Sequence, residues 1–155
     1  MAYSIYDIIN RMQAIYTRQL KRFNNIARLN ESRNPKLMSL TLTLNKYYED
    51  KINRYMSLLE AADHENWQVN QDRVTSVIEF IDKAFDSKTI EIDCLASALE
   101  AAALDVTHML DLIDQVLAQA DEKSDSRMIE FVSTIRISED KDKKALQHML
   151  EKLDK

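Results

Sequence analysis

Glycine is missing from all 155 residues of this chain, and proline occurs once, at Pro35. Tight turns with positive φ and most β-hairpin turns favour glycine, so the sequence is a poor candidate for an all-β or Rossmann fold. The same absence excludes both common glycine-rich phosphate loops. Hydrophobic residues make up 45% of the chain and charged residues 30%, a balance typical of globular proteins. The composition predicts a single all-α domain over residues 1–155.

The longest uninterrupted apolar pattern covers residues 89–120. Read in sevens, one line of this segment holds Ile92, Leu99, Val106, Ile113 and Ala120. Further apolar residues flank that line on both sides, whereas Asp93, Glu100 and Asp114 fall on the opposite face. At about 1.5 Å per residue, the segment predicts a helix of roughly 45 Å that buries one broad face in a helical bundle.

Apolar residues at three- and four-residue steps predict further helices, over 3–28, 35–62, 70–85 and from 126 to the end. Asn34 is a good N-cap, and Pro35 then takes the first helical position. The polar run 86–89 is expected to cap the long helix. In the last helix, residues 139–144 (EDKDKK) interrupt the apolar rhythm and are interpreted as a solvated face. The sequence leaves open whether that helix bends near Ser138.

The two ends of the chain match each other at an offset of 90 residues. Segments 49–51 and 139–141 both read Glu-Asp-Lys, and the capping turns at Asn34 and Ser124 agree at the same offset. The offset also aligns the apolar stripe of the first helix with that of the long helix. The pattern predicts two repeated hairpins with a connection that carries the short helix. Their boundaries are 3–62 for the first hairpin, 63–88 for the crossover and 89–154 for the second hairpin.

Residues 34–60 (NPKLMSLTLTLNKYYEDKINRYMSLLE) have a proline-led start, a long amphipathic run and an acidic, lysine-rich segment that ends in leucines. This segment resembles the second helix of the rubrerythrin-like branch of the ferritin-like superfamily. The likeness extends by pattern over most of both hairpins. It implies an up-down four-helix bundle with a long crossover connection.

The resemblance also implies where a di-iron centre would lie. That family binds metal through carboxylates and a Glu-x-x-His pair on the second and fourth helices, and this chain contains no Glu-x-x-His. The matching positions are Tyr48 and Lys51 on the second helix, Ser138 and Lys141 on the fourth, and Ile15 or Tyr16 on the first. Because a protonated lysine cannot bind a metal, the resemblance implies a bundle without the di-iron ligands, and we expect no cofactor.

Lys51 lies in the middle of the apolar stripe of the second helix. The simpler interpretation places it at the edge of the stripe, with its ammonium in water. The alternative is a polar core centre in which Asp105, Glu139 and Asp142 hold the ammonium and Tyr48 donates a hydrogen bond.

The remaining chemistry-bearing residues predict no catalytic set. His108 follows Asp105 by three positions but points away from the apolar stripe, so it is expected at the surface. Cys94 is the single cysteine, which excludes an internal disulfide, and we expect a small core or edge residue. Trp67 is expected to cap one end of the bundle or to mark a contact surface. The tyrosines of the first hairpin are expected in the core, with hydroxyls that could line a small polar cavity: Tyr16, Tyr47, Tyr48 and Tyr55.

The net charge of −5, with both signs interleaved, argues against nucleic acid as a partner. No apolar run reaches the ~18 residues of a membrane span, and the first residues lack a signal-peptide pattern, so a cytoplasmic location is expected. The sequence predicts a homo-oligomeric binding or scaffold protein without a metal centre, its partner unidentified, and leaves open whether it is an enzyme. Two alternatives remain open. One is an oxidoreductase whose metal site is built from Asp105, Glu139 and Asp142, and the other is a regulatory bundle whose acidic surface docks a basic protein.

Overall fold

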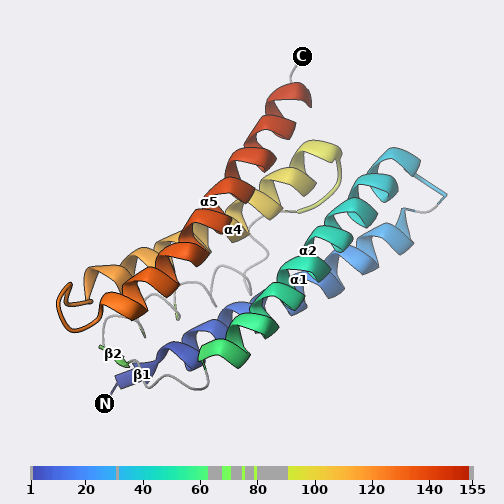
Figure 1. Ribbon diagram of the computed structural model, residues 1–155. Helices are drawn as coiled ribbons and strands as arrows, with labels where there is room; N and C mark the ends of the chain where they lie inside the picture. Colours follow the sequence, from blue (N-terminus) through green and yellow to red (C-terminus); the bar gives the residue numbers. More distant parts are fainter. Residues whose placement is uncertain are drawn as a thin grey trace. The chain divides into compact units, whose positions relative to one another are not determined.

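The computed structural model describes residues 2–30, 32–62, 68–70, 75, 79 and 91–153. Over this part of the chain it is mostly helical, as the composition predicts, with four long helices and one pair of short strands (Figure 1). The helices are α1 (Ile5–Leu29), α2 (Pro35–Ala62), α4 (Leu95–Ala118) and α5 (Ser126–Leu153). The strands are β1 (Ala2–Ser4) and β2 (Gln68–Asn70).

The strands form an antiparallel ribbon that the sequence does not predict. Tyr3 pairs with Val69 at its centre, where helices were predicted to begin at residues 3 and 70. Three residues are too few to show the alternation that marks a strand, although Tyr and Val both favour β structure. Most of the predicted 70–85 helix and Trp67 lie outside the described residues; of that segment, Thr75 and Glu79 are helical.

The chain divides into two compact units, each containing one helical hairpin. The first unit comprises Ile5–Asn66 and Ile92–Ala98, and so holds α1 and α2. The second comprises Met1–Ser4, Trp67–Glu91 and Leu99–Lys155, and holds the ribbon, α5 and most of α4. We call them the first and second units. Helices α1 and α2 fall within the predicted hairpin 3–62, and α4 and α5 within 89–154.

The turn of the first hairpin is closed by two asparagines instead of glycine. At the end of α1, Asn30 donates both its backbone N–H and its side-chain amide to the carbonyl of Ile26, at 3.1 and 2.8 Å. At the start of α2, Asn34 Oδ1 accepts the N–H of Leu37 at 3.1 Å. Asn34 is therefore the N-cap, as predicted, and Pro35 occupies the first helical position.

Asn34→Ala is expected to lower the free energy of unfolding by about 1 kcal/mol, because the N–H of Leu37 loses its acceptor at a helix end. Asn53→Ala is the matched control, since Asn53 is exposed in the interior of α2 and alanine is the better helix former there. Urea unfolding followed by circular dichroism measures both. Equal effects from the two variants would contradict the capping role.

The second hairpin begins later than predicted. Helix α4 starts at Leu95, so Ile92 and Asp93 lie before it and not on its stripe. The reason is a reciprocal cap in which Cys94 is the N-cap. Ser97 Oγ accepts the N–H of Cys94 at 3.1 Å, and Cys94 Sγ accepts the N–H of Ser97 at 3.4 Å. A cysteine in the position usually taken by serine or threonine gave no recognisable start signal.

Helix α5 is continuous from Ser126 to Leu153 and is not interrupted near Ser138. Asp140 and Lys144, one turn apart, form an ion pair of 3.0 Å along its surface. Within residues 139–144, Lys141 and Lys144 are exposed as predicted, but Glu139 is buried. The solvated-face interpretation is therefore wrong for Glu139. Arg136 reaches Asp114 at 2.7 Å and links α5 to α4.

Burial patterns of the two hairpins match at two different offsets. On α1 and α4 the buried pairs lie 90 residues apart: Ile9 with Leu99, Met12 with Ala102, Tyr16 with Val106 and Phe23 with Ile113. On α2 and α5 they lie 91 residues apart: Leu37 with Met128, Thr41 with Val132, Leu44 with Ile135 and Tyr55 with Leu146. The spacing between the buried residues of the two helices is thus one residue greater in the second hairpin, and α5 starts at Ser126, 91 residues after the start of α2 at Pro35.

The two offsets change which residues correspond. In segment 49–51 the lysine is buried and the glutamate exposed, whereas in segment 139–141 the glutamate is buried and the lysine exposed. The shared Glu-Asp-Lys text therefore does not mark equivalent positions. At the offset of 91 residues, Tyr48 aligns with Glu139 and Lys51 with Asp142.

Candidate functional site: a buried lysine and buried carboxylates

Lys51 is fully buried, with an exposed fraction of 0%. The interpretation that its ammonium reaches water is wrong, because the stripe of α2 is broad enough to include position 51 between Tyr48 and Tyr55, both also buried. Nζ donates a hydrogen bond of 3.0 Å to the hydroxyl of Tyr47. It also lies over the ring of Tyr16, 4.4 Å from the centroid, and 5.0 Å from the ring centroid of Tyr47.

An aromatic cluster surrounds this ammonium within the first unit. The ring of Tyr16 stacks on that of Tyr55 and tilts against that of Tyr48, with centroid separations of 5.7 Å in both cases. Tyr48 in turn stacks on Phe23 at 5.3 Å and meets Tyr47 edge-on at 5.4 Å. The four tyrosines predicted for the core do gather there. Tyr47 is the half-buried member, and the other three are buried.

A hydroxyl at hydrogen-bond distance from Nζ belongs to Tyr47, a residue that the predicted polar centre did not include. Tyr47 is four residues before Lys51, one helical turn away, so its side chain lies on the same side of α2. That spacing was a usable signal in the sequence. Tyr47 lies beside the apolar stripe that includes positions 48 and 55, so the stripe alone did not indicate it.

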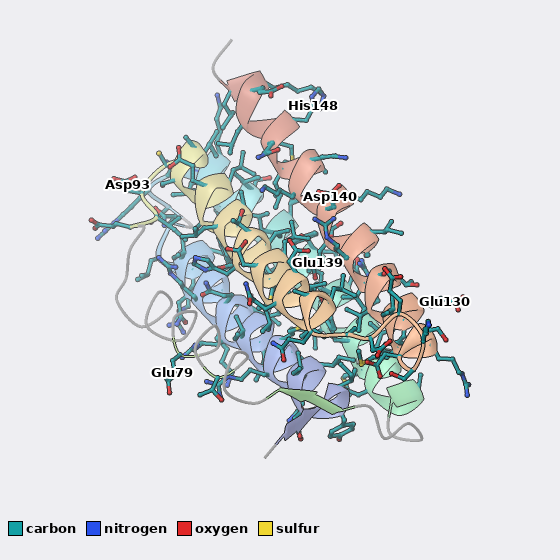
Figure 2. The ribbon with its side chains drawn as sticks, turned by 90° about the vertical axis from the view of Figure 1, so that its left-hand side faces the viewer. Glu79, Asp93, Glu130, Glu139, Asp140 and His148 are labelled. Carbon is teal, nitrogen blue, oxygen red and sulfur yellow. The ribbon has the colours of Figure 1, made fainter. Side chains whose placement is uncertain are left out.

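Two of the three predicted carboxylates are buried in the second unit. Asp105 on α4 has an exposed fraction of 2%, and Glu139 on α5 has one of 1%. Asp142, the third, is half-buried. Figure 2 labels Glu139 next to Asp140, and the two side chains leave α5 in different directions. Asp140 bonds to Lys144 at the surface, and this hydrogen bond is the main cause that lowers the pKa of Asp140.

Among the described residues, no three or more histidine, cysteine, aspartate or glutamate side chains lie close enough together to hold a metal ion. Asp105, Glu139 and Asp142 are all within that part of the chain. The structure therefore buries two of these acids without assembling the three into a ligand set.

His108 is buried, with an exposed fraction of 7%, and the expectation of a surface histidine is wrong. The cause is the small-residue face of α4. Besides the predicted stripe, a second line of α4 is buried, which includes Ala98, Ala101, Asp105 and Leu112. Burial lowers the pKa of His108, since desolvation disfavours the imidazolium, and nearby Asp111 offsets part of this effect.

His108 should make the stability depend on pH in a defined direction. Its pKa is lowered in the folded chain, so below the ordinary value of about 6.5 the unfolded chain binds more protons. We expect the free energy of unfolding to fall as the pH drops from about 7 through 6. His108→Gln should flatten this slope in urea titrations between about pH 5 and 8. His148→Gln removes an exposed histidine from α5 and is the matched control; a slope unchanged in His108→Gln would refute the assignment.

Other buried polar groups of the first unit escaped the sequence analysis. Gln19, Thr41 and Asn45 are all buried. Thr41 Oγ1 donates back to the helix, where the carbonyls of Leu37 and Met38 lie at 3.0 and 2.9 Å, and the amide of Asn45 bonds to Asn24 across the hairpin. Glutamine and asparagine are usually surface residues, so the apolar periodicity did not point to Gln19 or Asn45. Cys94 is exposed, which fits the predicted edge position.

Comparisons of this chain with protein-family models, with curated proteins and with solved structures found no match. In the described part of the chain, none of the helices combines the length and the apolar character needed to cross a membrane. A functional argument for this chain therefore starts from its buried polar residues.

Proposed function

We propose that this chain is a ferritin-like bundle, built from two repeated hairpins, that has no metal centre and acts as a binding or scaffold protein. The observation that carries this proposal is the complete burial of Lys51 at the position where the resemblance places a histidine ligand. An ammonium has no lone pair to offer a metal, and its positive charge repels a cation.

The residues of the first unit do not fit a di-iron centre. Nζ of Lys51 is already engaged by the hydroxyl of Tyr47 and by the face of Tyr16. Ile15 and Tyr16 are buried at the place of the first-helix carboxylate, and Tyr48 at that of a glutamate. None of these side chains supplies the carboxylate or imidazole that such a site requires.

Charge balance supports a polar core centre in place of a metal. A fully buried ammonium is stable only if its surroundings compensate its charge. Asp105 and Glu139 are the aspartate and glutamate that the described part of the chain buries. These are two of the three acids that the sequence analysis named for a polar core centre, and the third, Asp142, is half-buried.

Metal analysis of the full chain, purified without chelators, tests the proposal. The expected result is far less than one metal ion per chain and an unchanged melting temperature in chelator. Stoichiometric iron or manganese would overturn it and favour the second candidate, a ferritin-like oxidoreductase. The burial of Asp105 and Glu139 is the observation behind that candidate. In that case Asp105→Asn with Glu139→Gln should abolish metal binding.

The proposal extends to self-association. Leu42 and Met56 are exposed on α2, fourteen positions apart and therefore close to one helical line. Sedimentation at several concentrations is expected to give a dimer or larger species.

We place the protein in the cytoplasm, where the exposed thiol of Cys94 stays reduced. A monomer with a basic partner would favour the regulatory alternative.

A further inference from the structure

Tyr16 and Tyr47 present a cation with a ready-made set of contacts inside the first unit. The ammonium of Lys51 lies over the ring of Tyr16, 4.4 Å from its centroid. It bonds to the Tyr47 hydroxyl at 3.0 Å and lies 5.0 Å from the centroid of that ring. The faces of aromatic rings carry negative electrostatic potential, and cages of such rings are a known way to recognise ammonium ligands.

The walls of this cage are held in place by other rings. Tyr16 is supported on α1 by contacts with Tyr48 and Tyr55, and Tyr47 meets Tyr48 edge-on. Tyr48 is backed by Phe23. Packed aromatic side chains have few alternative rotamers, so the cage geometry does not depend on the cation that it holds.

We propose that Tyr16 and Tyr47 form a cage selective for a primary alkylammonium ion, and that Lys51 fills it as an intramolecular ligand. The inference is independent of the proposed scaffold function. It concerns the chemistry of one site in the first unit, and it holds whether or not the chain oligomerises.

Shortening the Lys51 side chain to alanine empties the site of a group of known size and charge. Lys51→Ala keeps Cβ and removes three carbons and the ammonium. The atoms removed match n-propylammonium in size and charge. Enclosed apolar cavities left by such truncations do admit small molecules that match the removed atoms. The full-length Lys51→Ala chain should therefore bind n-propylammonium, whereas the wild type should not, because its cage is filled.

The test is thermal unfolding of Lys51→Ala with added n-propylammonium chloride, compared with n-propanol and with sodium chloride at equal concentration. The expected result is a saturable rise in melting temperature for the ammonium alone, since a ligand that binds only the folded chain stabilises it by mass action. Titration calorimetry gives the affinity. An equal rise with n-propanol would show a cavity without charge selectivity, and an equal rise in the wild type would show a non-specific salt effect; either result overturns the proposal.

A second pair of variants separates the aromatic cage from any charge nearby. In the Lys51→Ala background, Tyr16→Phe keeps the ring face and should change the affinity by less than about threefold. Tyr16→Leu removes the face and should weaken binding by about tenfold or more, the loss expected for a desolvated cation–π contact. Equal affinities for the two variants would overturn the role of the ring.

If Lys51→Ala does not fold, the wild type itself provides the readout. The ε-methylene protons of Lys51 should resonate upfield of those of the other lysines, because Nζ lies over the Tyr16 ring. Tyr16→Phe should keep that ring-current shift and Tyr16→Leu should remove it. A wild-type chain without the shift would overturn the proposal.

Discussion

Lys51→Met is expected to lower the free energy of unfolding by about 3 kcal/mol or more. Methionine preserves most of the stem but removes the hydrogen bond to Tyr47 and the contact with the Tyr16 ring. It also leaves the half-buried hydroxyl of Tyr47 without this donor. Equilibrium unfolding in urea measures the change.

Lys46→Met is the matched control, because Lys46 lies on the same helix with its side chain 73% exposed and makes only a surface ion pair with Asp50. That variant should change stability by less than about 0.5 kcal/mol. An unchanged stability of Lys51→Met would remove the basis of the polar centre.

Tyr16→Ala should destabilise the chain by about 3–5 kcal/mol, the range for truncation of a buried aromatic side chain. The ring of Tyr16 touches those of Tyr48 and Tyr55 and lies under the ammonium of Lys51, so its removal leaves a cavity among groups that cannot all relax. Tyr16→Phe keeps these ring contacts and should cost only a fraction of that amount.

Tyr6→Ala is the control on the same helix, since the side chain of Tyr6 is 38% exposed. This variant should lower the free energy of unfolding by about 1 kcal/mol or less. A partly exposed ring buries less apolar surface, and its removal leaves a smaller cavity. Comparable losses of stability in Tyr6→Ala and Tyr16→Ala would show that the aromatic cluster contributes no more to stability than an exposed tyrosine does.

The start of a helix could be predicted from the sequence wherever its capping residues were of the usual types. The cap at Asn34 acts within three residues of itself, so the start of α2 was predicted to the residue. The start of α4 was missed by six residues because its cap is a cysteine paired with Ser97. The ribbon was missed because its two strands are distant in sequence and too short to carry a pattern.

The buried positions show where single-helix periodicity fails. A periodicity analysis ranks residues around one helix axis, whereas burial depends on how many neighbours cover that helix. Lys51 was assigned to an edge and is fully buried. His108 was assigned to solvent, yet it lies on a second covered face of α4 that only the tertiary structure reveals. The burial of Asp105 and Glu139 agrees with the alternative that the sequence left open.

The position of the buried stripe decides which charge of the Glu-Asp-Lys segment is buried. On α2 the stripe includes Lys51 and leaves Glu49 exposed, whereas on α5 it includes Glu139 and leaves Lys141 exposed. The same three residues thus bury a positive charge in the first unit and a negative charge in the second, without any substitution within the segment.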